Sequence, residues 1–300
     1  MSWLTVLLRF SRPHTVIATS TQVLTLYLIS GGLQPGGPAA LLLLLLTLVS
    51  ALAVNLYIVG LNQITDIEID KLNKPDLPIA AGDLSPRDAY RIVAVAGTLG
   101  LILAWLGGPI LLVTLGAILL IGTAYSLPLV RLKRFPIWAA LSIAVARGLL
   151  ANLGVALHFH FSLGNPIPLL ALTMLGVFFF GFAIVIALYK DLPDTIGDRA
   201  FAIETFTTRF GPQRVLLLGQ LILTFSYLLP IMIGLVGLPQ PEAFFLLISH
   251  LALVALFWLI SSRVDLTSHV AIKRFYMFIW LLFYTEFVLL SIYGTVWRVA

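Results

Sequence analysis

Long apolar runs separated by short polar segments dominate the chain. Each run is close to the length of about 20 residues that a helix needs to cross the hydrocarbon core of a bilayer. Glycine and proline fill several of the intervening segments, as in Gly107-Gly108-Pro109, and indicate tight connections. The runs predict nine membrane-spanning helices, near residues 14–32, 39–62, 89–107, 109–128, 136–157, 167–189, 214–237, 242–262 and 274–297.

The composition supports an all-α integral membrane protein that forms one domain over residues 1–300. Of the 300 residues, 60% are apolar or aromatic and 10% are charged, whereas soluble domains have roughly 45–50% and about 25%. The chain contains no cysteine, which excludes disulfide scaffolds, thiolate metal sites and cysteine nucleophiles.

The basic residues predict the orientation of the chain in the membrane. Apart from Arg147 and Arg298, every lysine and arginine falls on the side of the N-terminus and of the loops that follow the even-numbered helices. The positive-inside rule therefore places the N-terminus and these loops in the cytoplasm and the C-terminus on the opposite side. Topology explains the net charge of +5 better than nucleic-acid binding does. The start of the chain lacks the layout of a signal or transit peptide, which favours a bacterial chain or a mature plastid protein.

The acidic residues follow the same partition, apart from Glu242 and Glu286, although the positive-inside rule makes no demand on carboxylates. The second apolar run ends in the segment NQITDIEID, in which Asn62, Asp66 and Asp70 are spaced four residues apart. On a continuous helix these three side chains lie on one face and point toward a common volume.

A second acidic motif repeats this spacing at the end of the sixth run. The segment KDLPDTIGD contains Lys190, Asp191, Asp194 and Asp198. Its positions 190, 194 and 198 follow those of the first motif by 128 residues, which predicts a weak internal repeat of a four-helix unit. Pro193 and Gly197 predict that the helix ends early here.

Paired carboxylates at a helix end repel each other unless a cation lies between them. Hard divalent cations take oxygen ligands, and Mg²⁺ characteristically binds one or two carboxylates together with substrate phosphates. Either motif alone is compatible with a solvated helix end, but two motifs on one membrane face, flanked by bases, favour a site for Mg²⁺ and a diphosphate. The flanking bases are Lys71, Lys74, Arg131, Lys133 and Lys190.

At these residues the chain resembles the intramembrane aromatic prenyltransferases of the UbiA superfamily. The resemblance covers FSRPHT at 10–15, NLYIVGLNQITDIEIDKLNKPDLPIAAGDLS at 55–85, GTAYSLPLVRLKR at 122–134 and YKDLPDTIGDRAFAIETF at 189–206. DKLNKPDLP and KDLPDTIGDR are similar to the branch of the family that prenylates homogentisate. One departure is Leu129, where the family pattern has a second proline after Pro128.

The resemblance implies a fold of nine transmembrane helices around a central cavity, and a Mg²⁺-dependent reaction. Mg²⁺ bound by Asn62 with Asp66 and Asp70, and by Asp191 with Asp194 and Asp198, draws off the diphosphate of a prenyl donor. The aromatic ring of homogentisate then attacks the allylic cation and the acceptor loses its carboxylate, which with phytyl diphosphate gives the 2-methyl-6-phytylbenzoquinol of tocopherol (vitamin E) biosynthesis. The implied catalytic residues are Asp66, Asp70, Asp194 and Asp198, and the implied diphosphate ligands include Tyr125 and Lys133.

The same resemblance leaves the acceptor and the donor open. Members of the family also use 4-hydroxybenzoate, a naphthoate or a chlorophyllide, and the donor can be longer or unsaturated. The homogentisate assignment implies a cyanobacterial plasma or thylakoid membrane, with the active-site loops on the cytoplasmic, or stromal-equivalent, side. The sequence does not indicate an oligomeric state.

Three further polar residues are candidates for binding the acceptor. Arg147 lies inside the fifth run, where an arginine is costly and usually faces a cavity or a partner, so it favours either an acceptor carboxylate or an internal pair with Glu286. Family likeness implies that Arg12 binds the acceptor, although topology also explains an arginine there. Asn55 could line the same cavity or form an interhelical hydrogen bond.

A secondary transporter is the alternative from a different class, because internal repeats and intramembrane charges also mark transporters. Transporter sites lie near the bilayer midplane, whereas these carboxylates follow the apolar runs at one membrane face. Their position favours the enzyme.

Overall fold

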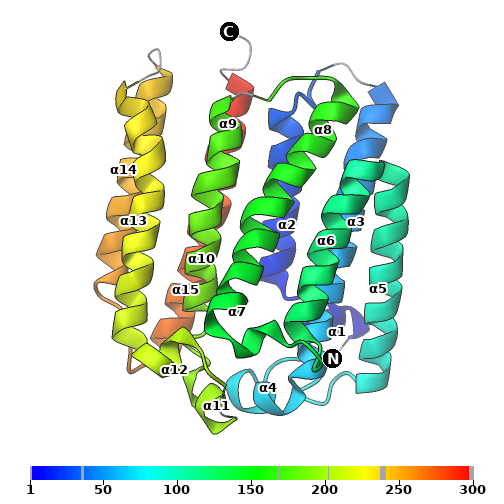
Figure 1. Ribbon diagram of the computed structural model, residues 1–300, viewed down its shortest axis with the longest axis vertical. Helices are drawn as coiled ribbons and strands as arrows, with labels where there is room; N and C mark the ends of the chain where they lie inside the picture. The colour runs from blue at the N-terminus through cyan, green and yellow to red at the C-terminus, as the bar shows by residue number, and fades with distance from the viewer. Residues whose placement is uncertain (1, 35–36, 168, 202, 237–240, 297–300) are drawn as a thin grey trace.

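The computed structural model describes residues 2–34, 37–167, 169–201, 203–236 and 241–296, and all regular structure within these ranges is helical (Figure 1). The long elements are α2 (Pro13–Ile29), α3 (Gly37–Thr65), α5 (Pro86–Gly107), α6 (Pro109–Ser126), the continuous α7 (Pro136–Ile143), η2 (Ala144–Gly154) and α8 (Val155–Leu163), the continuous α9 (Leu169–Thr173), η3 (Met174–Phe178) and α10 (Phe179–Tyr189), α13 (Pro212–Val236), α14 (Glu242–Ser261) and α15 (His269–Val296). The short ones are α1 (Trp3–Phe10), α4 (Ile67–Asn73), η1 (Leu132–Arg134), α11 (Thr195–Ala200) and α12 (Phe206–Phe210).

A long helical segment occupies each of the nine predicted windows. Within the described ranges, eight segments are long and apolar enough to cross a membrane. The ninth, α2, has 17 residues, which lies at the lower end of the range of about 17–25 for a transmembrane helix. The prediction of an all-α membrane protein is therefore confirmed.

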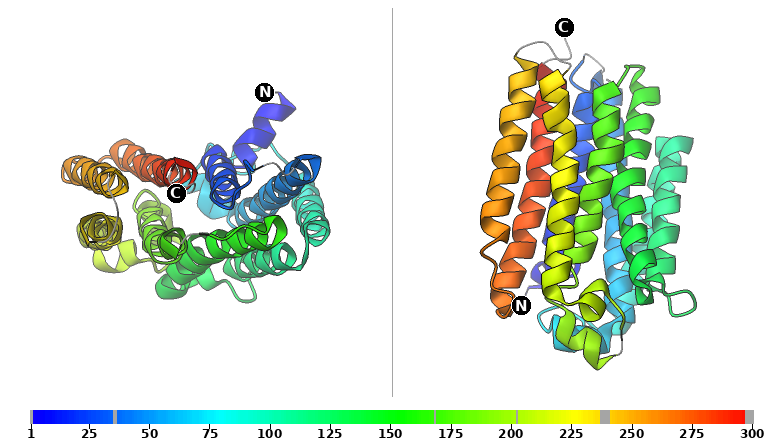
Figure 2. Two further views of the ribbon diagram at one scale, coloured as in Figure 1. Left: turned by 90° about the horizontal axis from the view of Figure 1, so that it is seen from above. Right: turned by 60° about the vertical axis from the view of Figure 1, so that its left-hand side comes forward.

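Six of the long segments form a closed ring. Going around it, α2 packs on α3, α3 on α6, α6 on η2, η2 on α10, α10 on α15, and α15 packs back on α2. The ring thus joins the two ends of the chain, and α5, α13 and α14 pack on its outside (Figure 2).

Close approach and aromatic packing hold these helices together. Ser50 Oγ donates to the Gly100 carbonyl at 2.6 Å, joining α3 to α5. A Cβ at Gly100 would lie 2.9 Å from Val54 Cγ2, so the two backbones meet where a small residue permits it. On the other side of the ring, the fully buried rings of Phe179 and Phe287 stack at 4.3 Å and join α10 to α15.

The two acidic motifs lie at the same end of the bundle and fold alike. α3 ends at Thr65 and α4 begins after Asp66, whose φ of −120° and ψ of 20° interrupt the helix. The expectation that Asn62, Asp66 and Asp70 stack on one continuous helix is therefore wrong. α10 ends at Tyr189, and α11 begins after Asp194, so the second helix ends early as predicted. In both motifs the aspartate that precedes the short helix is its N-cap residue.

Candidate active site

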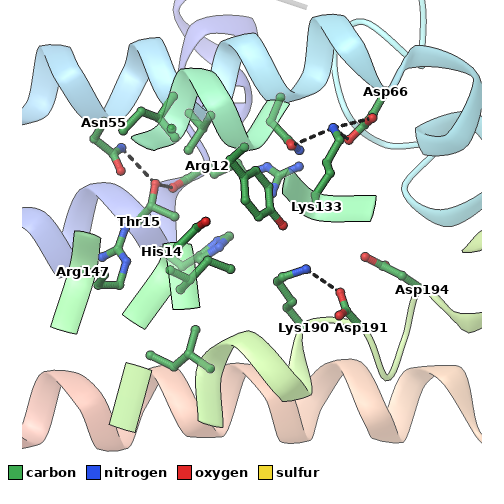
Figure 3. Close-up of a pocket in the computed structure, with 18 of the residues that line it drawn as sticks. Arg12, His14, Thr15, Asn55, Asp66, Lys133, Arg147, Lys190, Asp191 and Asp194 are labelled. Atoms are coloured by element: carbon green, nitrogen blue, oxygen red, sulfur yellow. Dashed lines mark hydrogen bonds and ion pairs between the residues drawn. The ribbon is translucent and has the colours of Figure 1, made fainter. Parts of the chain in front are cut away.

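A cavity of about 1010 Å³ lies inside the ring and reaches the acidic end of the bundle. Side chains from all six ring segments, together with α4 and the loops next to α11, line it. Its deep part is bounded by apolar residues such as Val23, Ala51 and Leu115, and its other end by charged ones. Figure 3 shows the charged residues of the two motifs facing each other across this space.

The first acidic motif is paired with bases from the loop after α6. Lys133 Nζ donates to both carboxylate oxygens of Asp66 at 2.6 Å, and Arg131 donates to the same carboxylate at 3.2 Å. Lys133 also reaches Asn62 Oδ1 at 3.3 Å, and Ser126 Oγ donates to that oxygen at 3.4 Å. A hydrogen-bonded basic cluster therefore covers the end of α3.

The second motif is held by lysines of its own and of the first motif. Lys190 Nζ lies 2.5 Å from Asp191 Oδ1 and 5.9 Å from the centre of the Tyr125 ring. Lys74, which follows α4, forms an ion pair with Asp194 at the start of α11. This pair links the two motifs directly across the mouth of the cavity.

Asn73 is a functional candidate that the sequence analysis missed. Its Oδ1 accepts from the backbone N–H of Gly197 at 2.8 Å, and its Nδ2 donates to Asp198 Oδ1 at 3.3 Å. A Cβ at Gly197 would collide with the Asn73 side chain, so glycine allows α11 to dock on α4. Asn73 is three residues after Asp70, on the same face of α4, and that spacing was the signal available in the sequence.

Two carboxylate oxygens at this end of the cavity, Asp70 Oδ2 and Asp194 Oδ1, are buried and have no hydrogen-bond partner in the part of the chain that the structure describes. Burial raises the pKa of Asp70 to about 6. Burial together with the charges of Asp191 and Asp194 raises the pKa of Asp198 to about 7. Burial is the largest cause of both raised pKa values, and a cation bound beside these carboxylates would favour their charged forms.

The donor set fits a metal that is shared with a substrate phosphate. Within the described ranges, no three acidic or histidine side chains lie close enough to hold one ion between them. Magnesium, however, needs only one or two carboxylates when phosphate oxygens and water complete its shell. The unpaired oxygens of Asp70 and Asp194 and the amide oxygen of Asn62 are ligands of this kind.

Arg147 faces the cavity from η2, away from the acidic motifs. Its guanidinium carbon lies 5.2 Å above the ring of Trp280, and the His14 ring meets the same Trp280 at 5.1 Å. Among the described residues, no carboxylate lies within 4 Å of Arg147. The alternative of an internal pair with Glu286 is wrong, because Glu286 lies 3.2 Å from His250 Nε2 on α14. The sequence analysis did not single out Trp280, because it lies within an apolar run.

Arg12 and Asn55 line the same cavity. Arg12 precedes α2 with a φ of +53°, a left-handed conformation that is uncommon for residues other than glycine. Its Nε and Nη2 atoms are buried and have no hydrogen-bond partner among the residues that the structure describes. Asn55 Nδ2 donates to Thr15 Oγ1 at 3.0 Å, so Asn55 both lines the cavity and forms the interhelical bond.

Lys71 does not belong to the site. It pairs with Glu68 on α4 at 2.7 Å, and its side chain is 49% exposed. It does not line the cavity, because the break at Asp66 turns α4 so that Lys71 faces outward. The expectation that Lys71 binds the diphosphate is corrected accordingly.

Comparison with known proteins identifies the family of this chain. Residues 23–282 match the UbiA prenyltransferase family. The chain belongs to this family. It is 44% identical over 285 residues to the homogentisate phytyltransferase of Synechocystis sp., covering 94% of this chain and 92% of that protein.

Less similar proteins match the chain over most of its length as well. The Arabidopsis thaliana homogentisate solanesyltransferase is 40% identical over 94% of this chain and 74% of its own length. A solved UbiA homologue from Archaeoglobus fulgidus, bound to GPP and Mg²⁺, superposes with a TM-score of 0.68 at 19% identity, covering 95% of this chain and 99% of the other. The chain therefore has the UbiA fold.

Proposed function

We propose that this prenyltransferase transfers a phytyl group from phytyl diphosphate to the ring of homogentisate, giving 2-methyl-6-phytylbenzoquinol. The observation that carries the proposal is the pair of acidic motifs that face each other, with their lysines, at the polar end of an apolar cavity. The relatives named for homogentisate prenylation support the acceptor. They include a phytyl and a solanesyl enzyme, so the preference for phytyl rests on the higher identity to the phytyl enzyme.

Two sets of residues would hold Mg²⁺. They are Asn62, Asp66 and Asp70 from the first motif and Asp191, Asp194 and Asp198 from the second, all of which line the cavity. When bound, Mg²⁺ neutralises the charge that develops on the leaving diphosphate. The structures of a relative with prenyl diphosphates and Mg²⁺ agree with this choice of metal.

The bases around these carboxylates would hold the diphosphate. Lys74, Lys133 and Lys190 already lie at the mouth of the cavity, with Arg131 and Tyr125 beside them. Each lysine is paired with an aspartate of a motif, so each ammonium lies within a side chain's reach of a phosphate placed between the motifs. Stabilising the leaving group in this way lowers the barrier to breaking the C–O bond.

The acceptor would lie between the diphosphate and the deep part of the cavity. Arg12 and Arg147 would bind its carboxylate, and Asn55 a ring hydroxyl, since all three line the cavity. The ring forms a bond to the carbon that leaves the diphosphate and loses its proton there. The side chain loses CO₂ and gains a proton in its place. Apolar walls keep out the water that would otherwise capture the allylic cation.

The charge distribution supports a cytoplasmic, or stromal-equivalent, position for the N-terminus and the acidic end of the bundle. A relative that is 44% identical comes from a cyanobacterium, which supports a location of this protein in the plasma or thylakoid membrane of a cyanobacterium. Transport is not supported, since the chain belongs to a prenyltransferase family, and α4 and α11, which follow the two acidic motifs, lie at one end of the bundle (Figure 1).

A membrane assay with phytyl diphosphate tests this function, with homogentisate and 4-hydroxybenzoate compared as acceptors, with and without Mg²⁺. The expected result is a decarboxylated prenyl quinol that forms only with homogentisate and Mg²⁺. Asp66→Asn should abolish it, whereas Glu68→Gln, a control on the exposed face of α4, should not. Product formed only from 4-hydroxybenzoate would show that homogentisate is not the acceptor. Product formed without Mg²⁺ would refute the metal site.

A further inference from the structure

Arg147 is carried by an unusual stretch of backbone. Residues Ala144–Gly154 form a π-helix of 11 residues, whereas π-helices usually occur as single turns and often at functional sites. The stretch is tightly packed on both sides. A Cβ at Gly148 would lie 2.8 Å from the carbonyl oxygen of Phe179 on α10, and one at Gly154 would collide with Thr114 on α6. The backbone that presents Arg147 is therefore fixed between two neighbours.

One buried side chain holds this backbone from inside. Asn152 is fully buried, and its Nδ2 donates to the carbonyl of Gly148 at 2.9 Å and to that of Arg147 itself at 3.2 Å. Its Oδ1 accepts from Gln22 Nε2 at 2.7 Å. Gln22 is only 4% exposed, lies on α2 and lines the cavity. The amide pair thus connects the backbone of Arg147 to the helix that begins after Arg12.

The guanidinium of Arg147 has no ionic partner among the described residues and rests on Trp280. An arginine in a membrane span is costly without a partner, and its planar fork matches a carboxylate in two parallel hydrogen bonds. Such binding depends on orientation, since a misplacement of about 1 Å can cost about a hundredfold in rate.

We propose that Asn152 and Gln22 are positioning residues that fix Arg147 for the carboxylate of the acceptor. This inference rests on the proposed function, because it takes the acceptor to be a carboxylate bound by Arg147. Neither amide donates to the substrate in this scheme; Asn152 acts through the backbone of residues 147 and 148, and Gln22 acts through Asn152.

The alternative is that the amide pair merely joins two helices. The chain offers a matched control for that role. Gln220 Nε2 donates to Ser261 Oγ at 3.0 Å and joins α13 to α14. Gln220 is 6% exposed and does not line the cavity. Replacing it removes an equally buried interhelical amide without touching the site.

The experiment compares Asn152→Leu, Gln22→Leu and Gln220→Leu in membranes with homogentisate and phytyl diphosphate. We expect both Asn152→Leu and Gln22→Leu to raise the KM for homogentisate about tenfold and to leave the KM for phytyl diphosphate within about twofold. Gln220→Leu should change neither KM. Arg147→Gln should raise the KM for homogentisate as well, and adding Asn152→Leu to it should have little further effect, because the two residues act as one unit.

Three results would each overturn the positioning role. The first is an equal change in the KM values for both substrates, and the second is additivity of the effects of Arg147→Gln and Asn152→Leu. The third is a Gln220→Leu variant whose KM values change as those of Asn152→Leu and Gln22→Leu do. If Asn152→Leu does not fold, Gln22→Leu decides by the same comparison. A wild-type protein that uses 4-hydroxybenzoate and not homogentisate contradicts the proposed acceptor but not the positioning role, which is then read from the KM for that carboxylate.

Discussion

Lys133 Nζ lies 2.6 Å from both carboxylate oxygens of Asp66. Asp66 lies between α3 and α4, Lys133 lies in η1, and both side chains are 11% exposed. Without a substrate, the ammonium neutralises the carboxylate. In the proposed function, a bound diphosphate and Mg²⁺ would let the carboxylate bind the cation and the ammonium bind phosphate, so the pair would connect the two parts of the donor site.

This relationship predicts the effect of Lys133→Gln. We expect turnover to fall by about a hundredfold, because the preformed positive charge that would stabilise the leaving diphosphate is lost, and we expect the KM for phytyl diphosphate to rise. Lys71→Gln removes the same charge from outside the cavity and should leave the rate within about twofold. Initial rates against donor concentration in membranes measure both, and equal losses in the two variants would refute the role of Lys133.

Gly197→Ala tests the docking of α11 on α4. The added Cβ would collide with Asn73, so the bond that the Gly197 N–H donates to Asn73 and the bond that Asn73 donates to Asp198 should be lost and the second motif displaced. We expect the Mg²⁺ concentration for half-maximal activity to rise about tenfold, the loss usual when groups that orient metal ligands are removed. The matched control is Gly116→Ala, where a Cβ would meet nothing within 4 Å; a similar Mg²⁺ response from both variants would count against the docking.

The pair of Glu286 and His250 predicts a structural effect without a catalytic one. Both side chains are 2% exposed, they lie 3.2 Å apart, and they join α15 to α14 away from the large cavity. Glu286→Leu removes the side chain that faces the buried Nε2 of His250, and leaving such a polar atom without a partner should destabilise the protein by about 1–3 kcal/mol. Thermal unfolding in detergent should give Glu286→Leu a lower Tm than the control variant Glu242→Gln, which changes a glutamate at the start of α14. A raised KM for either substrate would instead place Glu286 in the active site.

The depth of the cavity predicts how donor length is controlled. Ala51 lines the apolar part and precedes Asn62 by 11 residues, about 16 Å along α3. Ala51→Phe should block this part, so that the KM for phytyl diphosphate rises about tenfold while that for geranyl diphosphate changes little. Competition between the two donors in one reaction measures the shift, and an unchanged product ratio would show that the phytyl chain lies elsewhere.

The sequence predicted the elements of the site better than their exact geometry. It identified both acidic motifs, their common end of the bundle and the early end of the second helix, which stops at Tyr189, before Pro193. It did not predict the break at Asp66, because the segment around it contains no proline or glycine and the φ and ψ of a single residue depend on what packs around it. Asn73 was missed for a similar reason, since its partner Gly197 is 124 residues away in the chain.

The sequence by itself determined the membrane-embedded class, the nine helical segments and the identity of the charged groups, because the hydrophobic effect and the cost of burying charge act on each segment locally. Only the tertiary structure decided which of these groups meet. It brought Lys133 to Asp66, Lys74 to Asp194 and Arg147 to Trp280, and it turned Lys71 away from the cavity. These contacts depend on how α4, η1, η2 and α15 pack around one volume, and that packing is a property of the whole ring of helices.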